Sequence, residues 1–208
     1  MDDKLFFSEL LGLKDPWFIT DIQLDTALKR VDVFIEHRSG IRFPCPLCET
    51  FSSVYDHTEE REFRHLNVCQ MSAYLHVRIP RVKCPTHGVQ QITHGLAENN
   101  STMTLDLETL VLDIAHECSI ESTAHLLNID WHTCHRIQQR AVERGLSRKP
   151  HAIPERIGVD EKSFARGHKY ETVVYNLDKS TVEYVGDNRE QTSLEQYYKR
   201  FSPEERSQ

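Results

Sequence analysis

The sequence predicts a mixed α+β chain made of several small modules in series. Two spaced pairs of metal-ligand residues, Cys45-x-x-Cys48 and Cys84-x-x-His87, flank strand-like segments and predict a β-rich metal-binding module. A helical apolar pattern follows between residues 104 and 137, and alternating apolar runs resume after residue 157. We expect a helix and a strand within 1–40, a zinc-ribbon module at 41–98, a helical module at 101–149 and an incomplete α/β segment at 155–208.

The composition is that of a folded protein whose positive charge is local. Of the 208 residues, 38 % are hydrophobic and 27 % are charged, with a formal net charge of −7, which argues against a protein that coats nucleic acid. Residues 131–149 nevertheless contain five basic residues and one acidic residue, whereas residues 1–40 contain five basic and eight acidic residues. Contacts with nucleic acid should therefore be confined to one part of the chain.

The sequence also predicts where the chain is found. Its first residues, Met1-Asp2-Asp3-Lys4, lack the features of a secretory signal, and no run approaches the roughly eighteen apolar residues of a membrane span. We expect a cytoplasmic protein with no membrane partner. In a reducing compartment its six cysteines are metal ligands and core residues rather than disulfides.

Cys45, Cys48, Cys84 and His87 have the ligand types and spacing of a tetrahedral structural zinc site. A proline follows the first ligand of each pair, and Gly88 is suited to a left-handed turn. Reduced thiols beside a surface histidine are the alternative. Four other residues could compete as ligands, but none is paired with another cysteine or histidine, so we assign them to surface or packing positions: His57, His65, Cys69 and His76.

Short elements are expected around these pairs. A first helix should end at Gly12, and residues 93–101 should form a polar linker. In the segment 72–82 apolar residues alternate with polar ones, which predicts one long strand with Leu75, Val77 and Ile79 on one face. The other expected strands are 31–37 and 61–66.

Residues 104–137 are laid out as a helix-turn-helix. Thr104 is a candidate N-cap for a helix through residue 118, Asn128 occupies the turn position that requires a positive φ, and Asp130 can cap the next helix. This second helix would be the recognition helix for double-stranded DNA; a helical hairpin inside a larger core is the alternative. Six residues are expected on its exposed side: Trp131, His132, Thr133, His135, Arg136 and Arg140.

After a stiff connector at 149–154, the chain should form a strand ending on Asp160, then strands at 169–178 and 181–185 and a helix capped by Thr192. This order looks like the opening of an RNase H-like fold, in which several carboxylates hold two Mg²⁺ ions. Asp160 would be the first of them, although a carboxylate at a strand end is often a cap or turn residue.

Together these motifs resemble bacterial insertion-sequence transposases of the ISL-three family. The resemblance rests on the two ligand pairs, the segment 61–66, the helix-turn-helix, Gly158-Val159-Asp160-Glu161-Lys162-Ser163 and Gly186-Asp187-Asn188-Arg189. It implies a zinc ribbon, a helix-turn-helix that reads terminal inverted repeats, and a DDE domain that cuts and joins DNA with Mg²⁺. It also implies a bacterial protein that lies at the nucleoid when bound to DNA, and it allows a homo-oligomer.

Two departures from the family pattern shape the expected function. His87 stands where many relatives have a cysteine, which zinc accepts. No counterpart of the second Asp or the closing Glu occurs before Gln208, and neither Glu161 nor Asp178 is suitably placed to replace them. We therefore expect a truncated transposase that binds inverted-repeat DNA through its zinc ribbon and helix-turn-helix without transposing by itself. The alternatives are a zinc-ribbon regulator or adaptor unrelated to transposition, and a nuclease completed by another chain.

Overall fold

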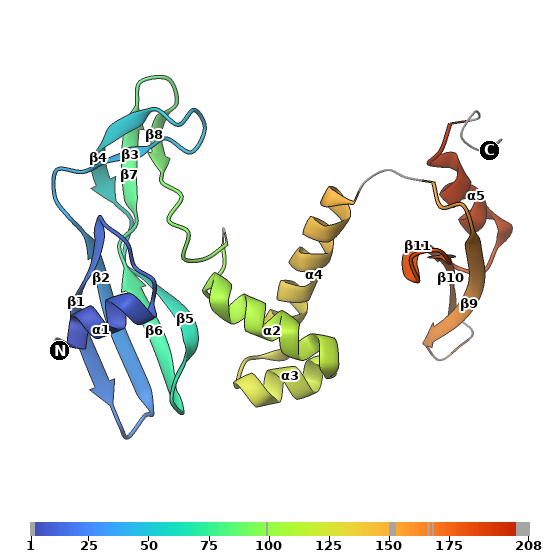
Figure 1. The fold of residues 1–208 in the computed structure, drawn as a ribbon, viewed down its shortest axis with the longest axis horizontal. Coiled ribbons are helices and arrows are strands. Elements are labelled where there is room, and N and C mark those ends of the chain that lie inside the picture. The colour runs from blue at the N-terminus through green and yellow to red at the C-terminus, as the bar shows by residue number, and fades with distance from the viewer. Residues whose placement is uncertain (1–2, 99, 150–152, 166, 168, 203–208) are drawn as a thin grey trace. The chain divides into compact units, whose positions relative to one another are not determined.

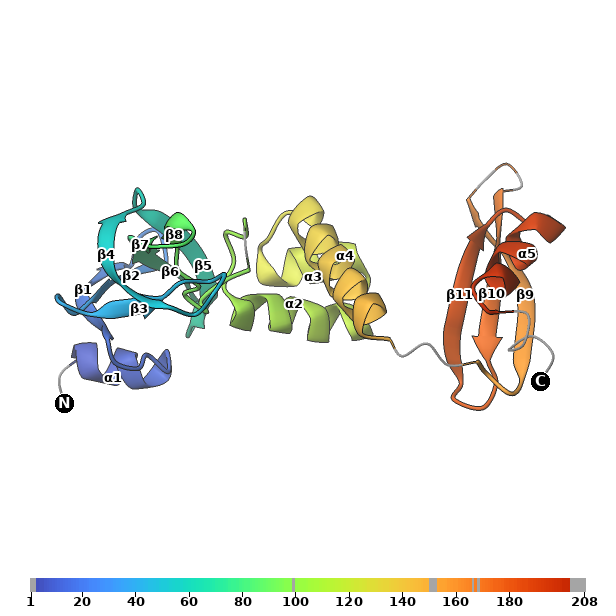
Figure 2. The same ribbon diagram turned by 90° about the horizontal axis from the view of Figure 1, so that it is seen from above.

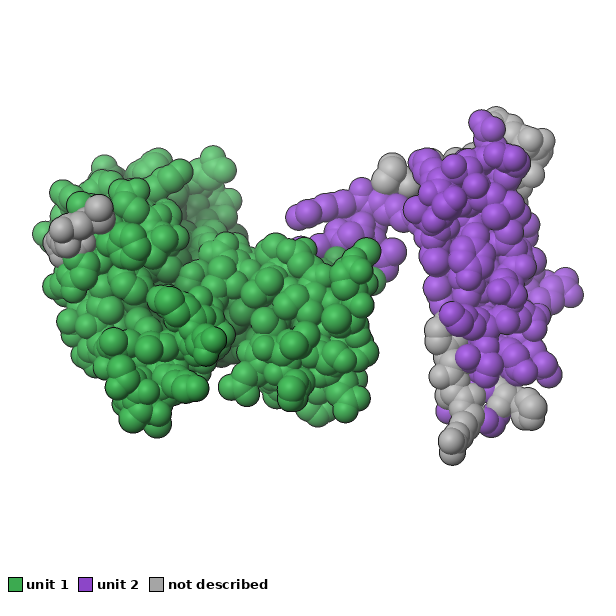
Figure 3. All heavy atoms as spheres, turned by 60° about the horizontal axis from the view of Figure 1, so that its bottom comes forward, with its two compact units in different colours: residues 1–143 green, residues 144–208 purple. Residues whose placement is uncertain are grey.

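The computed structural model describes residues 3–98, 100–149, 153–165, 167 and 169–202, which divide into two units, 1–143 and 144–208 (Figure 3). The division falls inside helix α4 (Trp131–Arg148). Part of the predicted connector, residues 150–152, lies outside the described residues. Among the described helices, none combines the length and apolar character needed to cross a bilayer.

The first sheet joins the amino-terminal strands to the two strands between the ligand pairs (Figure 1). Its order is β1 (Trp17–Asp25), β2 (Arg30–His37), β6 (Met71–Val77) and β5 (Arg61–Val68). The β2–β6 pair is parallel, and the other two pairs are antiparallel. Val31, Val33 and Ile35 alternate into the core, as the sequence predicts, while α1 (Asp3–Leu10) contributes Phe7 to the same cluster.

The second sheet carries the ligand pairs. Its order is β3 (Arg42–Pro44), β4 (Phe51–His57), β7 (Pro80–Cys84) and β8 (Gly88–Gln91). The prediction of one strand at 72–82 is wrong, because β6 ends at Val77 in the first sheet and β7 begins at Pro80 in the second. Pro80 has no N–H for a continuous ladder, and the chain changes sheets there. The predicted inward face is confirmed, since Leu75, Val77 and Ile79 are buried.

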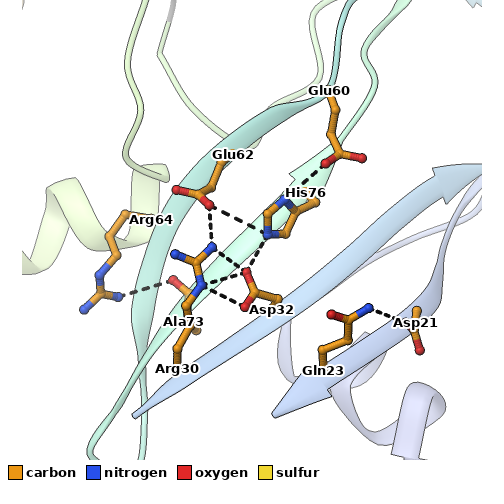
Figure 4. Close-up of polar contacts among 9 residues, drawn as sticks. All are labelled: Asp21, Gln23, Arg30, Asp32, Glu60, Glu62, Arg64, Ala73 and His76. Carbon is orange, nitrogen blue, oxygen red and sulfur yellow. Dashed lines mark hydrogen bonds and ion pairs between the residues drawn. The ribbon is translucent and has the colours of Figure 1, made fainter. Parts of the chain in front are cut away.

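An ion-pair network crosses the first sheet (Figure 4). The Arg30 guanidinium donates hydrogen bonds to Asp32 and to Glu62, linking β2 to β5. From β6, His76 Nε2 lies 2.6 Å from Asp32 Oδ1, and its ring stacks on Phe34 with centroids 4.6 Å apart. The Asp32–Arg30 hydrogen bonds are the largest cause of a lowered pKa for Asp32, and the hydrogen bond to His76 acts in the same direction.

This network does not resemble a metal site, although Asp32, Glu62 and His76 place potential ligand atoms within 4.8 Å of one another. The Arg30 guanidinium already occupies the space between the two carboxylates and offsets part of their negative charge. A divalent cation would have to displace this fixed cation first. We therefore assign the network to holding β2, β6 and β5 together.

Helices follow the second sheet. In Figure 2, α2 (Leu105–Glu117), α3 (Ile120–Leu127) and α4 lie against one another, around a core that includes Val111, Cys134 and Ile137. The predicted Thr104 cap is confirmed, because its hydroxyl accepts a hydrogen bond from the Leu107 N–H. The predicted turn is confirmed as well, since Asn128 is left-handed, with φ of 51°.

The second unit is a three-stranded sheet in the order β11 (Thr181–Asp187), β10 (Lys169–Asn176) and β9 (Ile157–Ala165), with α5 (Gln191–Lys199) packed on one face (Figure 2). Two expectations are wrong here. Asp160 lies in the middle of β9 rather than at its end, since pairing with β10 extends the strand to Ala165. Thr192 lies inside α5, whose N-cap is Glu190.

We predict that Asp32→Asn lowers the free energy of unfolding at pH 7 by about 1–3 kcal/mol, since charged hydrogen bonds are lost. The folded-state pKa of Asp32 is lowered, so its contribution is present above the ordinary carboxyl pKa and disappears as the pH falls through the folded value. Urea unfolding from pH 7 down to pH 3 measures this, and the difference between wild type and variant should shrink on acidification.

The matched control is Asp21→Asn. Asp21 also accepts a side-chain hydrogen bond, from Gln23 on the same strand, but that pair is exposed and outside the network (Figure 4). Equal losses of stability for the two variants at pH 7 would contradict the role assigned to Asp32.

Candidate metal centre and nucleic-acid interface

Two tight turns bring the ligand pairs together. In the first turn the Glu49 N–H donates to the Cys45 carbonyl at 2.8 Å, and Glu49 itself is left-handed with φ of 59°. In the second, Cys84 pairs with Gly88 across the β7–β8 hairpin, and Gly88 has the predicted positive φ, 69°. The pairing of β4 with β7 then places the two turns side by side.

The four ligand atoms have the dimensions of a zinc tetrahedron. Cys48 Sγ lies 3.6 Å from Cys84 Sγ, and His87 Nδ1 lies 3.8 Å from Cys45 Sγ and 3.7 Å from Cys84 Sγ. Zn–S bonds of about 2.3 Å and Zn–N bonds of about 2.0–2.1 Å give tetrahedral edges of about 3.8 Å for S···S and about 3.6 Å for S···N. The Cys₃His set therefore fits structural zinc, with no coordination position left for a substrate.

At two of the four ligands, Cys48 and Cys84, the surroundings favour the thiolate that zinc requires, whereas hydrogen bonds to the cysteines, led by Cys84, raise the pKa of His87. Hydrogen bonds from the Thr50 hydroxyl and backbone N–H lower the pKa of Cys48 to about 6. Backbone hydrogen bonds in the second turn, led by that of His87, lower the pKa of Cys84. Burial raises the pKa of Cys45, so this thiol depends most on the metal to become a thiolate.

The first turns of α4 expose a mixed aromatic and basic surface. Trp131 is 45 % exposed and stacks on the exposed His135 with centroids 5.1 Å apart, while His132 and Arg136 also face solvent. The predicted cap is confirmed, because Asp130 Oδ1 accepts from the Thr133 N–H at 2.9 Å. The expectation that Thr133 is exposed is wrong: it turns into the helical core, and its hydroxyl accepts a hydrogen bond from Arg136.

Arg140 lies in a setting that the sequence pattern does not predict. Its guanidinium pairs with Glu108 of α2 at 2.6 Å, and the Glu108 side chain is 3 % exposed. The Ser101 hydroxyl donates to the same carboxylate oxygen at 2.6 Å. Among the described residues, Glu108 Oε2 and Arg140 Nε have no hydrogen-bond partner. In the sequence, Glu108 directly follows the buried Leu107. A charged residue at such a position in an apolar helical pattern could have indicated a buried ion pair.

The linker before α2 fastens the helices to the first sheet. It runs along β5, where the Arg64 N–H donates to the Thr102 carbonyl and the Thr104 N–H donates to the Arg64 carbonyl. His65 Nδ1 lies 2.9 Å from the Thr104 hydroxyl, and burial lowers the pKa of His65. Because Thr104 also caps α2, the neutral imidazole supports the first turn of the helical module.

Asp160 is exposed, and its Oδ1 accepts a hydrogen bond from the Glu161 N–H at 2.8 Å. Within the described residues, the groups of three or more potential metal ligands are the Cys₃His set and the network around Asp32. Neither includes Asp160. The described part of the second unit thus does not assemble the several carboxylates that a pair of Mg²⁺ ions requires.

We predict that Cys84→Ala reduces the zinc content of purified protein from about one ion per chain to near zero, because three ligands remain in a site built for four. His87→Cys should retain zinc, since a fourth thiolate completes the same tetrahedron. Elemental analysis by mass spectrometry measures both. Cys69→Ala is the control for loss of an exposed thiol away from the site, and a similar loss of zinc in this variant would contradict the assignment.

A second prediction concerns the buried ion pair. Arg140→Ala should destabilise the chain by about 3 kcal/mol, because it leaves Glu108 charged, buried and without its cation. Replacing both residues with leucine should recover much of this loss. Chemical unfolding followed by circular dichroism measures the effect. Arg136→Ala is the matched control, with an expected change within about 0.5 kcal/mol; equal losses for Arg136 and Arg140 would contradict the assignment.

Comparison with known families gives three matches in the order of the structural modules. Residues 42–87 match the zinc-finger of transposase IS204/IS1001/IS1096/IS1165. Residues 93–142 match the helix-turn-helix domain of transposase family ISL3, and residues 157–208 match the transposase domain of DDE type from the same family. The predicted order of zinc ribbon, helix-turn-helix and partial DDE segment is confirmed.

Curated relatives point to the same family. The chain is 28 % identical, over its whole length, to the transposase for insertion sequence element IS1557 from two strains of Mycobacterium tuberculosis, CDC 1551 / Oshkosh and H37Rv. It spans 48 % of the length of these relatives. No solved structure matches the chain. With three consecutive ISL3 segments covering most of its residues, the chain belongs to the ISL3 family of insertion-sequence transposases.

Proposed function

We propose that this chain binds the terminal inverted repeats of an insertion sequence, with α4 as the recognition helix. The observation that carries the proposal is the exposed start of α4, where Trp131, His132, His135 and Arg136 lie outside the packed core. Residues at this end of a recognition helix meet base edges in the major groove. Bases and phosphates are suitable partners for this mixed aromatic and basic surface.

The remaining candidate residues divide by role. Arg136 is exposed and donates a hydrogen bond to the neighbouring Thr133 hydroxyl, so its guanidinium lies where it can reach a phosphate or a base. Arg140 instead acts through Glu108, and Thr133 through the cap with Asp130, so both orient the recognition helix. Because inverted repeats present the same site twice, we also propose that two copies of the chain occupy the two ends.

Zinc supports this function through structure. It would hold β4 and β7 in the register that places the second sheet beside the first. For DNA cleavage, we propose Asp160 as the first carboxylate of a Mg²⁺ site, on the strength of the family match over 157–208. Among the described residues, neither group of three or more potential metal ligands includes Asp160, and recognition of DNA is therefore the activity we assign to this chain.

We predict that Arg136→Ala weakens binding to a duplex carrying the terminal repeat and lowers the slope of log affinity against log salt by about one. Fluorescence anisotropy across a salt series measures both quantities, with a scrambled duplex as the reference. Arg38→Ala, which removes an exposed arginine outside the helices, should leave both unchanged. Equal affinity of the wild-type chain for repeat and scrambled duplexes would overturn the proposal, in favour of a regulator with a different partner.

A further inference from the structure

The outward face of the second sheet combines aromatic and basic side chains. Phe51 and Tyr55 of β4 are each 59 % exposed. The register places Arg42 of β3 on the same face as Phe51, since Arg42 pairs with Ser53 two residues along. Lys83 of β7 reaches the same face, with its Nζ 5.8 Å from the centre of the Tyr55 ring.

The opposite face of this sheet is the packed one. Phe43, Ser52, Val82 and Cys84 are buried, so the strands alternate between a covered side and an open side. The two exposed rings lie four positions apart on β4, at most about 13 Å at about 3.3 Å per residue, because the register with β7 shifts between Val54 and Asp56. Neither ring belongs to the hydrophobic cluster that covers the opposite face.

Charge on this face favours a polyanion. Arg42 donates to the Phe51 carbonyl and Lys83 lies over Tyr55, and within the described residues neither forms an ion pair with a carboxylate. Arg81, on the same face, is neutralised by Asp56. On a chain whose net charge is −7, two unneutralised basic groups beside two exposed rings form a local site for phosphate and base together.

The width of the sheet indicates the form of the nucleic acid. Four strands about 4.8 Å apart span about 14 Å before side chains are added, whereas the major groove of B-DNA is about 12 Å wide and admits a helix or a two-stranded ribbon. The sheet therefore cannot place Phe51 and Tyr55 against paired bases in the groove. Unpaired bases, by contrast, can stack on rings presented by an open sheet.

We propose that this face, with Phe51, Tyr55, Arg42 and Lys83, binds unpaired DNA bases next to the duplex read by α4. The inference rests on the proposed function, because it assigns a second, single-stranded DNA contact to the same chain. The rings stack on bases, and the two basic groups contact the flanking phosphates. Both rings lie on β4, and the pairing of β4 with β7 places Lys83 beside Tyr55.

The test uses the full zinc-loaded chain and a fluorescein-labelled single strand of mixed sequence, about twenty nucleotides long, long enough for binding sites of this kind. Phe51→Ala and Tyr55→Ala should each weaken binding about fivefold or more, as loss of one stacked base predicts. Tyr55→Phe keeps the ring and should bind as the wild type does. Phe6→Ala removes an exposed ring from α1, outside this face, and should also have no effect.

A second readout locates the contact. Photocrosslinking with 5-iododeoxyuridine in the single strand should attach the strand to peptides containing Phe51 or Tyr55. Unchanged single-strand affinity in both alanine variants would overturn the proposal and point to another occupant, such as a protein. Loss of duplex specificity alone would refute end recognition by α4 while leaving single-strand binding intact, so the two proposals fail separately.

Discussion

The fold of the first ninety residues depends on one constraint. Four metal-ligand side chains must meet at one point: Cys45, Cys48, Cys84 and His87. The second sheet is small, and much of its outer face is exposed, so apolar burial alone gives it little stability. A four-ligand metal joins its two turns and fixes the register of β4 with β7. The segment between the ligand pairs is then free to pair with β2 and complete the first sheet.

A series of polar contacts connects the first sheet to the helices. His65 on β5 supports the Thr104 cap of α2, and the Ser101 hydroxyl supports Glu108. Glu108 then holds Arg140 in the middle of α4. Polar groups buried in this way are costly unless their partners are in place, so the Arg140–Glu108 pair favours one packing of α4 against α2. These contacts link β5, α2 and α4 within the first unit.

The two surfaces that we propose as DNA contacts differ in shape. The start of α4 is narrow and can enter a groove, whereas the open face of the second sheet is wide and suits bases that have left the duplex. Both surfaces contain basic residues, although the chain as a whole has a negative net charge. Recognition would then depend on specific contacts, with phosphate attraction limited to a few basic groups.

The sequence by itself determined the features whose cause is local. Ligand type and spacing predicted the Cys₃His set, and short-range backbone preferences predicted the Thr104 and Asp130 caps and the left-handed Asn128. Only the tertiary structure decided features that depend on distant partners. It divided residues 72–82 between two sheets, extended β9 beyond Asp160, and turned Arg140 towards Glu108. Strand pairing and ion pairs join residues that are far apart in the sequence. A local sequence pattern therefore does not identify the partner strand or the partner side chain.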